Sequence, residues 1–193
     1  MPFYPVLADL ESIIQGKMGK RGFGTGINSA SQTDWGYRVH PISGEYTWHN
    51  GIDMGRPIGT PIFAPLDGFV EAAEEAGISG KLIRLTHNDK EFPEVYQTRY
   101  AHLDSWNVKR GDTVKKGKII GYVGNTGGST GAHLHFIVRV HPQYAPTIDG
   151  VARRDVDPLP YLVGASKKNN GVTMFSGMAL AVVGLYLYLS KTR

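Results

Sequence analysis

The sequence predicts a mainly β domain followed by one C-terminal transmembrane helix. The 193 residues include 25 glycines and 11 prolines, and this composition indicates many tight turns. Residues 34–163 consist of short runs rich in Val, Ile, Phe and Tyr, separated by Gly, Pro, Asn and Asp, which is typical of strands and turns. An apolar segment near the C-terminus predicts the membrane helix. A chain of this length accommodates one compact domain with short appendages.

Several runs within the β domain have the composition of individual strands. The segment 108–124 has turn residues on both sides of a short apolar run, and this pattern predicts a tight β-hairpin connection. The predicted strands cover residues 60–64, 68–73, 81–86, 94–103, 119–123 and 133–140.

The two ends of the chain differ in character from the β domain. Residues 1–33 form an arm that ends in a glycine-rich stretch and lacks the basic start and apolar core of a signal peptide. Residues 164–170 form a polar linker. No charged residue occurs between Lys168 and Lys191, and the segment 171–190 is long enough, at ~1.5 Å per residue, to cross a hydrocarbon layer of ~30 Å. A buried or interfacial helix is the alternative, and the nearly balanced flanking charges leave the orientation open.

The charge and composition argue against a nucleic-acid partner and against a metal site built from cysteine. Lys and Arg number 21 against 17 Asp and Glu, but the basic residues are scattered and no base-reading motif occurs, so a nucleic-acid partner is not indicated. There is no cysteine. Any metal must therefore be held by His, Asp or Glu.

The histidines of the β domain are spaced as metal ligands. His49 and Asp53 stand four residues apart in WHNGIDMG, and His133 and His135 stand two apart in GAHLHFIV. Residues i and i+2 of a strand project from one face. A tetrahedral catalytic zinc needs three nitrogen or oxygen ligands and keeps one position for water. His49, Asp53 and one member of the histidine pair meet this requirement, and His102 lies at the end of another predicted strand.

The remaining histidines are interpreted as structural. His40, His87 and His141 stand apart from these motifs, and isolated histidines are most often surface or hydrogen-bonded residues. His40, in YRVHP, is the one of the three that lies near the site motifs.

In these motifs the chain resembles the lysostaphin-type, or LytM-type, zinc metallopeptidases, which hydrolyse peptide bonds of peptidoglycan. The resemblance covers about residues 35–162. It depends on an ordered series of motifs: WGYRVHPISG, HNGIDMGRPIGTPIFAPLDGFV, YAHL, GDTVKKGKIIGYVGNTGGSTGAHLHF and VDPLPYL. The resemblance implies a largely antiparallel β-sheet domain, a partly open barrel or sandwich, with a narrow groove lined by loops. Ile137 departs from the family, whose members often carry Glu at that position.

The resemblance also implies a role for each site residue. His49, Asp53 and His135 are expected to bind one Zn²⁺ per chain, and His102 and His133 are expected to be the catalytic pair. Zinc lowers the pKa of water toward ~7 and polarises a carbonyl, while a neighbouring histidine transfers the proton. Peptidoglycan is the expected substrate. Whether the cross-link is D-alanyl–diaminopimelate or glycyl–glycine stays open, as does the oligomeric state.

Two other functions are compatible with parts of the sequence. A LytM-like module without catalysis would activate or position another wall hydrolase, but such a module is expected to lack ligands that this chain retains. The hairpin at 108–124 also resembles those of biotinyl and lipoyl carrier domains, which leaves the histidines unexplained. The C-terminal segment is expected to place the protein in a membrane, either the internal membrane of a phage virion or the bacterial cell envelope.

Overall fold

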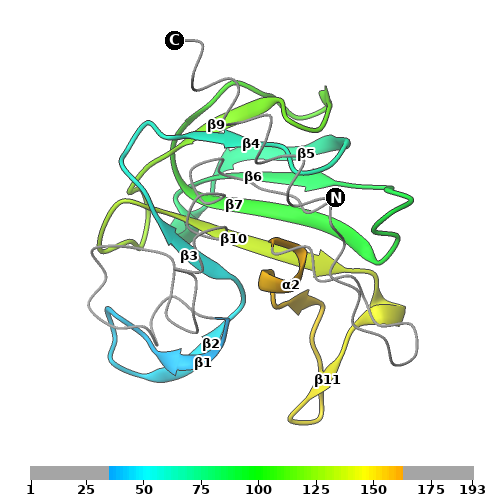
Figure 1. Cartoon of the computed structure of the whole chain (residues 1–193). Helices are drawn as coiled ribbons and strands as arrows, with labels where there is room; N and C mark the ends of the chain where they lie inside the picture. Colours follow the sequence, from blue (N-terminus) through cyan, green and yellow to red (C-terminus); the bar gives the residue numbers. More distant parts are fainter. Residues whose placement is uncertain (1–34, 163–193) are drawn as a thin grey trace, which may run out of the picture. The chain divides into compact units, whose positions relative to one another are not determined.

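The computed structural model describes residues 35–162 (Figure 1). Residues 35–158 lie in one compact unit, and the short helix α2 (Leu159–Leu162) belongs to a second unit. Within the described range, no helix is long and apolar enough to span a membrane. The predicted arm at 1–33, the linker at 164–170 and the transmembrane segment at 171–190 lie outside the described residues.

The compact unit is built on a nine-stranded sheet in which every pair is antiparallel, so the predicted mainly antiparallel β fold is confirmed. The main path of the sheet runs β13 (Asp155–Val156), β10 (His133–Val140), β7 (Val95–Trp106), β6 (Lys81–Thr86), β5 (Gly68–Glu75) and β8 (Thr113–Val114). Three further strands join off this path: β3 (Ile52–Gly55) pairs with β10, and β9 (Ile119–Val123) pairs with β4 (Pro61–Phe63) and β7.

Two small sheets and two short 3₁₀ helices complete the unit. The small sheets are the hairpins β1 (Gly36–Val39) with β2 (Tyr46–His49), and β11 (Thr147–Ile148) with β12 (Val151–Ala152); the 3₁₀ helices are η2 (Gly77–Ser79) and η3 (Pro142–Tyr144).

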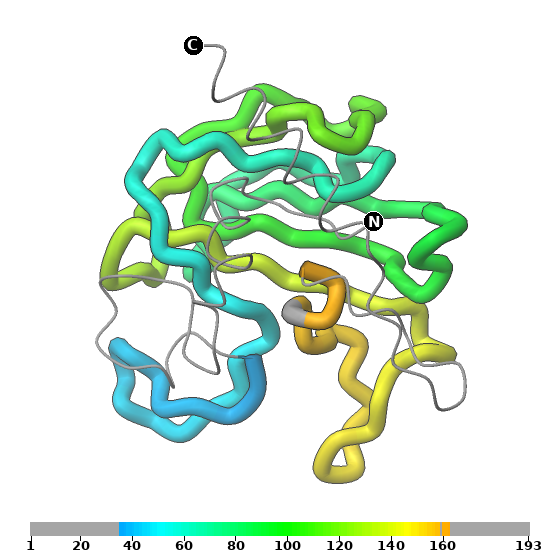
Figure 2. Tube along the Cα trace, viewed as in Figure 1, coloured from blue at the N-terminus to red at the C-terminus, as the bar shows by residue number. Residues whose placement is uncertain are grey.

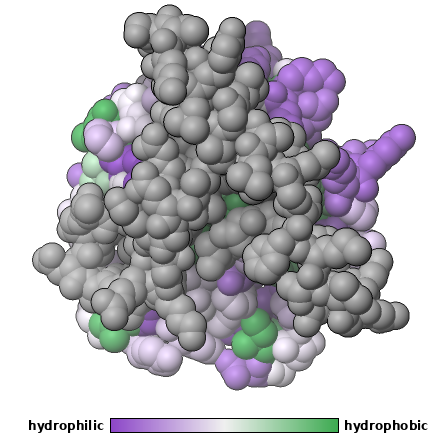
Figure 3. Space-filling model, in the orientation of Figure 1, coloured by the Kyte–Doolittle hydropathy of each residue, from purple (hydrophilic) through white to green (hydrophobic). Residues whose placement is uncertain are grey.

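The two faces of β10 differ sharply in chemistry. Leu134, Phe136 and Val138 are fully buried on one face, where apolar side chains are removed from water. The alternating positions on the opposite face are His133, His135, Ile137 and Arg139, and all of these except Ile137 are polar. Figure 2 shows the yellow trace of β10 passing beside the cyan trace of β3, its partner in the sheet. In the view of Figure 3 the described surface is mostly hydrophilic, with a few separate hydrophobic spots.

The predicted strands at 81–86, 119–123 and 133–140 form with the predicted boundaries, and those at 60–64, 68–73 and 94–103 form with shifted ends. The predicted hairpin at 108–124 is wrong in its pairing. Strands β8 and β9 flank the turn, but β8 pairs with β5, whereas β9 pairs with β4 and β7. The turn between β8 and β9 therefore connects two separate parts of the nine-stranded sheet.

His87 is a structural histidine, buried at the end of β6. Its Nδ1–H donates to the Asp67 carbonyl at 2.9 Å, so Nε2 accepts from the Thr98 hydroxyl at 2.8 Å. Burial lowers the pKa of His87, and the contact with the Asp67 carbonyl only partly opposes this effect. The imidazole is therefore neutral in the folded protein at pH 7.

We expect His87→Gln to flatten the pH dependence of stability below pH 6.5. The unfolded chain, with a histidine pKa of ~6.5, binds a proton more readily than folded His87 does. The stability contributed by neutral His87 is thus complete above that pH and is lost as the pH falls below it. Urea unfolding midpoints at several pH values between 5 and 7.5 measure this slope. If the slope in His87→Gln equals that of the parent, His87 does not contribute to the pH dependence of stability.

Candidate metal centre

The sheet register places Asp53 and His135 side by side. Asp53 of β3 is the direct antiparallel partner of His135 of β10. The neighbours of Asp53 in β3, Ile52 and Met54, are buried in the core, so alternation directs the Asp53 carboxylate to the opposite face. His133 projects from that same face of β10 as His135.

His49 reaches this site from a different sheet. It ends β2, which pairs only with β1 among the described strands. Gly51 then lets the chain pass close over β10: a Cβ at this position would lie 2.5 Å from the Phe136 carbonyl oxygen and 2.9 Å from His135 Cε1. Only glycine fits this approach without displacing the backbone of β10.

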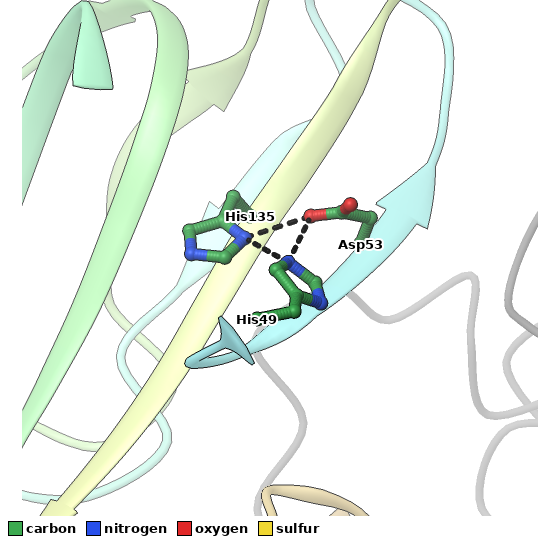
Figure 4. A group of neighbouring side chains, drawn as sticks. All are labelled: His49, Asp53 and His135. Carbon is green, nitrogen blue, oxygen red and sulfur yellow. Dashed lines mark hydrogen bonds and ion pairs between the residues drawn. The ribbon is translucent and has the colours of Figure 1, made fainter. Parts of the chain in front are cut away.

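The three predicted ligands converge through one atom each (Figure 4). Asp53 Oδ1 lies 2.7 Å from His135 Nδ1 and 3.3 Å from His49 Nε2, and the two nitrogens are 3.1 Å apart. The side chains of Asp53 and His49 are each 7% exposed. Burial opposes ionisation of Asp53, but hydrogen bonds from His135 and His49 outweigh it and hold the pKa of the carboxyl well below its usual range.

This donor set fits a zinc ion. Two imidazole nitrogens and one carboxylate oxygen are ligands that catalytic zinc uses, with bonds of ~2.0–2.1 Å, and the ligand atoms of such a tetrahedron lie ~3.3 Å apart. The observed separations of 2.7–3.3 Å are close to that spacing. His49, Asp53 and His135 fill three of the four positions of a tetrahedral zinc site and leave the fourth to another ligand.

Two residues that the sequence did not indicate, Arg38 and Asn50, hold the ligand side chains in place. Arg38 Nη2 donates to Asp53 Oδ2 at 3.0 Å, so the carboxylate directs its other oxygen to the histidines. Asn50 Oδ1 lies 3.3 Å from His135 Nε2, and the amide of Asn50 donates to Asp155 at 3.2 Å. Such contacts fix the orientation of metal-binding side chains. Arg38 falls inside WGYRVHPISG, but no spacing rule distinguishes it there.

His133 and His102 flank the same cluster. His133 Nδ1 lies 2.7 Å from the Gly131 carbonyl, and its Nε2 is 3.6 Å from Asp53 Oδ1. His102 Nδ1 lies 2.8 Å from the Thr126 carbonyl, and its ring centroid is 4.8 Å from that of His133. A carbonyl only accepts hydrogen bonds, so both rings carry their proton on Nδ1. In the neutral form of each ring, Nε2 therefore has a lone pair available.

His102 occupies this position because the backbone of β7 departs from regular alternation. Its φ is 62°, in the left-handed region that is uncommon for residues other than glycine. The register of β7 shifts around it against both β6 and β9. Burial, reinforced by the neighbouring His133, lowers the pKa of His102 to about 4. His102 is therefore neutral at the pH of most biological reactions.

The histidines interpreted as structural lie apart from this cluster. The Nδ1 of His40 accepts hydrogen bonds from the amides of Ile42 and Ser43, which caps the turn of the β1–β2 hairpin. His141 packs beside the ring of Tyr96, and His87 lies in the interior described above.

The family model described as peptidase family M23 matches residues 47–149, which contain all five predicted site residues. The chain belongs to peptidase family M23. Among solved structures, the catalytic domain of the antimicrobial peptidase lysostaphin from Staphylococcus simulans is 35% identical, with a TM-score of 0.51 over 67% of this chain and 88% of that chain. A zinc-containing peptidase from Vibrio cholerae is 34% identical, with a TM-score of 0.51 over 68% and 41% of the two chains. The predicted lysostaphin-type fold is confirmed.

Curated relatives match over a similar region. An uncharacterized metalloprotease of Haemophilus influenzae is 47% identical over 100 residues, which cover 51% of this chain and 20% of that protein. The peptidoglycan DD-endopeptidase ShyB of Vibrio cholerae is 43% identical over 103 residues, 53% of this chain and 23% of that protein. The similarity thus spans about a fifth to a quarter of the length of these curated relatives.

Proposed function

We propose that this M23 chain is a zinc-dependent endopeptidase that hydrolyses peptide cross-links of bacterial peptidoglycan. The observation that carries the proposal is the buried cluster of His49, Asp53 and His135, with two further histidines beside it. The name of the relative ShyB, a peptidoglycan DD-endopeptidase, supports the substrate class. No observation on the described residues favours the module without catalysis, because all five positions are present and adjacent.

The zinc would be held by His49 Nε2, Asp53 Oδ1 and His135 Nδ1. When bound, zinc supplies Lewis acidity, which polarises a scissile carbonyl and lowers the pKa of water to ~7. The protein residues around it fix the ligands. With Nδ1 of His135 on the metal, its Nε2–H donates to Asn50, and Arg38 holds the second oxygen of Asp53.

His133 is the proposed general base. Its Nδ1–H is bound to the Gly131 carbonyl, with Ser129 Oγ also within 3.1 Å, so the ring cannot rotate freely. Its Nε2, directed toward the ligand cluster, accepts a proton from the attacking water and returns it to the amine that leaves. Both transfers use the same atom, so the ring need not change orientation between them.

His102 supports this proton transfer. The bond from its Nδ1 to the Thr126 carbonyl leaves Nε2 as an acceptor, and its lowered pKa keeps the ring neutral. A neutral ring in this tautomer accepts a hydrogen bond from water, and it has no Nε2–H to donate to an oxyanion. We therefore assign His102 to orienting the attacking water.

Digestion of defined muropeptides by the full chain tests the proposed function. Mass analysis should find products cut at one peptide bond of the cross-link, and a chelator should abolish the cutting while added zinc restores it. Intact cross-links after incubation with the zinc-loaded protein would reject the enzyme and favour a binding module. Cutting that persists after complete removal of metal would reject the role of zinc.

We further propose that the segment 171–190 attaches the chain to a membrane. Its support is the sequence alone, a run of about 20 residues without charge. The full chain should sediment with lipid vesicles, and a variant that lacks residues 171–193 should not. Residence in a virion membrane is the more specific proposal, and absence of the protein from purified phage particles would exclude it.

A further inference from the structure

A hollow of ≈ 450 Å³ opens between the β1–β2 hairpin and the β11–β12 hairpin. These two hairpins lie at the lower edge of the sheet in Figure 1. Strand β12 forms part of the wall of the hollow. The polar and aromatic side chains that line it are Trp48, Asn50, Arg139, Arg153, Arg154 and Asp155.

The hollow adjoins the candidate metal centre. Asn50, which lines it, contacts Nε2 of the ligand His135 at 3.3 Å, and Trp48 immediately precedes the ligand His49. His135 and Arg139 project from the same face of β10, four residues or ~13 Å apart along the strand. An extended peptide whose scissile bond lies at the metal therefore reaches the hollow within a few residues.

The three arginines that line the hollow differ in their hydrogen-bond and ion-pair partners. Arg139 is held by Asp155 through two hydrogen bonds, at 2.6 and 3.1 Å. Arg154 donates to the Val140 carbonyl, and its guanidinium lies over the ring of Tyr96. Arg153 has no carboxylate within ion-pair distance among residues 35–162. Within this described range, Arg153 is thus a cation without a counter-ion beside the site.

Arg153 is nevertheless held in one orientation. Its guanidinium carbon lies 3.7 Å from the centroid of the Trp48 ring, and its Nη2 donates to the Tyr37 hydroxyl at 3.3 Å. The Nε atom of Arg153 is buried and has no hydrogen-bond partner in the described part of the chain. The same holds for Nε of Arg38 and Arg84, so this atom does not by itself mark a ligand site. Stacking on Trp48 occupies one face of the guanidinium. Nη1 has no hydrogen-bond partner among residues 35–162, so the edge formed by Nη1 and Nη2 is the part that can meet a ligand.

We propose that Arg153 is a specificity residue that binds a carboxylate of the peptide substrate in this hollow. Guanidinium and carboxylate match in a planar, two-bond geometry, and Arg153 is already oriented, so little side-chain freedom is lost on binding. This inference rests on the proposed endopeptidase function and adds a substrate class to it. The preferred cross-link carries a free carboxylate a few residues from the scissile bond, unlike an uncharged glycine bridge.

Two synthetic substrates test the proposal with the full chain loaded with zinc. Both contain a D-alanyl–diaminopimelate cross-link, and the C-terminal carboxylate of the acceptor stem peptide, which lies a few residues from the scissile bond, is free in one and amidated in the other. The parent should prefer the free carboxylate by ~10-fold or more in kcat/KM, the range of a charge-assisted hydrogen-bonded pair. Arg153→Gln should remove this preference by raising KM for the free form, and Arg153→Lys should keep only part of it. Arg110→Gln removes the same charge from an exposed turn and should keep the whole preference.

The outcomes separate this inference from the proposed function. If the parent cuts both substrates equally, or if Arg153→Gln keeps the parent's preference, the carboxylate subsite is wrong and the peptidase stands. If the parent cuts neither substrate, the proposed function fails. Calorimetric binding of the same two peptides then still decides the subsite, because Arg153→Gln should weaken binding of the free form alone. Equal binding of both forms by the parent would overturn the inference.

Discussion

Replacing His49, Asp53 or His135 by alanine should strip the protein of zinc and abolish its peptidase activity. Each substitution removes one of three converging ligand atoms and leaves too few for a closed site. The loss of zinc affinity should exceed the ~10–100-fold that removal of a supporting hydrogen bond costs. Metal content after dialysis, measured by mass spectrometry, gives the direct readout.

The Asp53 variant needs a control for folding. Asp53→Ala leaves Arg38, whose side chain is 8% exposed, without its carboxylate partner, and an unpaired buried charge destabilises a protein. Asp53→Asn keeps the shape of the side chain and should also lose zinc. Circular dichroism of both variants separates loss of metal from loss of fold. Full zinc occupancy in all of the ligand variants would reject the assignment of the site.

His133→Ala should keep its zinc and still lose turnover by about 10²–10⁴-fold, the usual contribution of a positioned general base. His133 Nε2 stands 3.6 Å from Asp53 Oδ1, near the cluster but not among the three converging atoms. His102→Ala should show a related but smaller defect, since that ring orients water without carrying the proton. Substrate binding should survive in both variants, so the loss should fall on kcat.

His40→Ala is the matched control, because it removes an imidazole that caps the β1–β2 turn and should have a milder effect. Two results would change the assignment. Loss of zinc in His133→Ala with retention in His135→Ala would exchange the roles of the two residues. Parent-level cutting of muropeptides by His133→Ala would exclude it as the general base.

The sequence predicted the strands whose apolar residues are dense and the face shared by His133 and His135. It did not predict β1, β2 and β3, because the segments 36–39, 46–49 and 52–55 mix aromatic, polar and charged residues. The strand conformation of β1 and β2 depends on their pairing with each other, and that of β3 on its pairing with β10. The short strands β11, β12 and β13 contain only two residues each, too few for a periodic pattern.

The position of His102 shows a different limit of sequence reasoning. Regular alternation would direct Ala101 and His102 to opposite faces of β7, yet the φ of 62° at His102 brings its ring to His133. Nothing in YAHL indicates this departure. The partner contacts of Arg38 and Asn50 were missed for a related reason, since they arise only when two sheets meet. The pairing of β8 and β9 also depends on strands far away in sequence.

The candidate ligands are divided between two sheets, and this division affects how the site responds to distant changes. Asp53 and His135 are neighbours in one hydrogen-bonded ladder, whereas His49 is carried by the separate β1–β2 sheet. Docking of that small sheet and capture of the ion are therefore thermodynamically linked. A substitution at the tip of the β1–β2 hairpin should therefore change the affinity for the metal, although it touches no ligand. The free energy of docking the β1–β2 hairpin would then be part of the free energy of binding the ion.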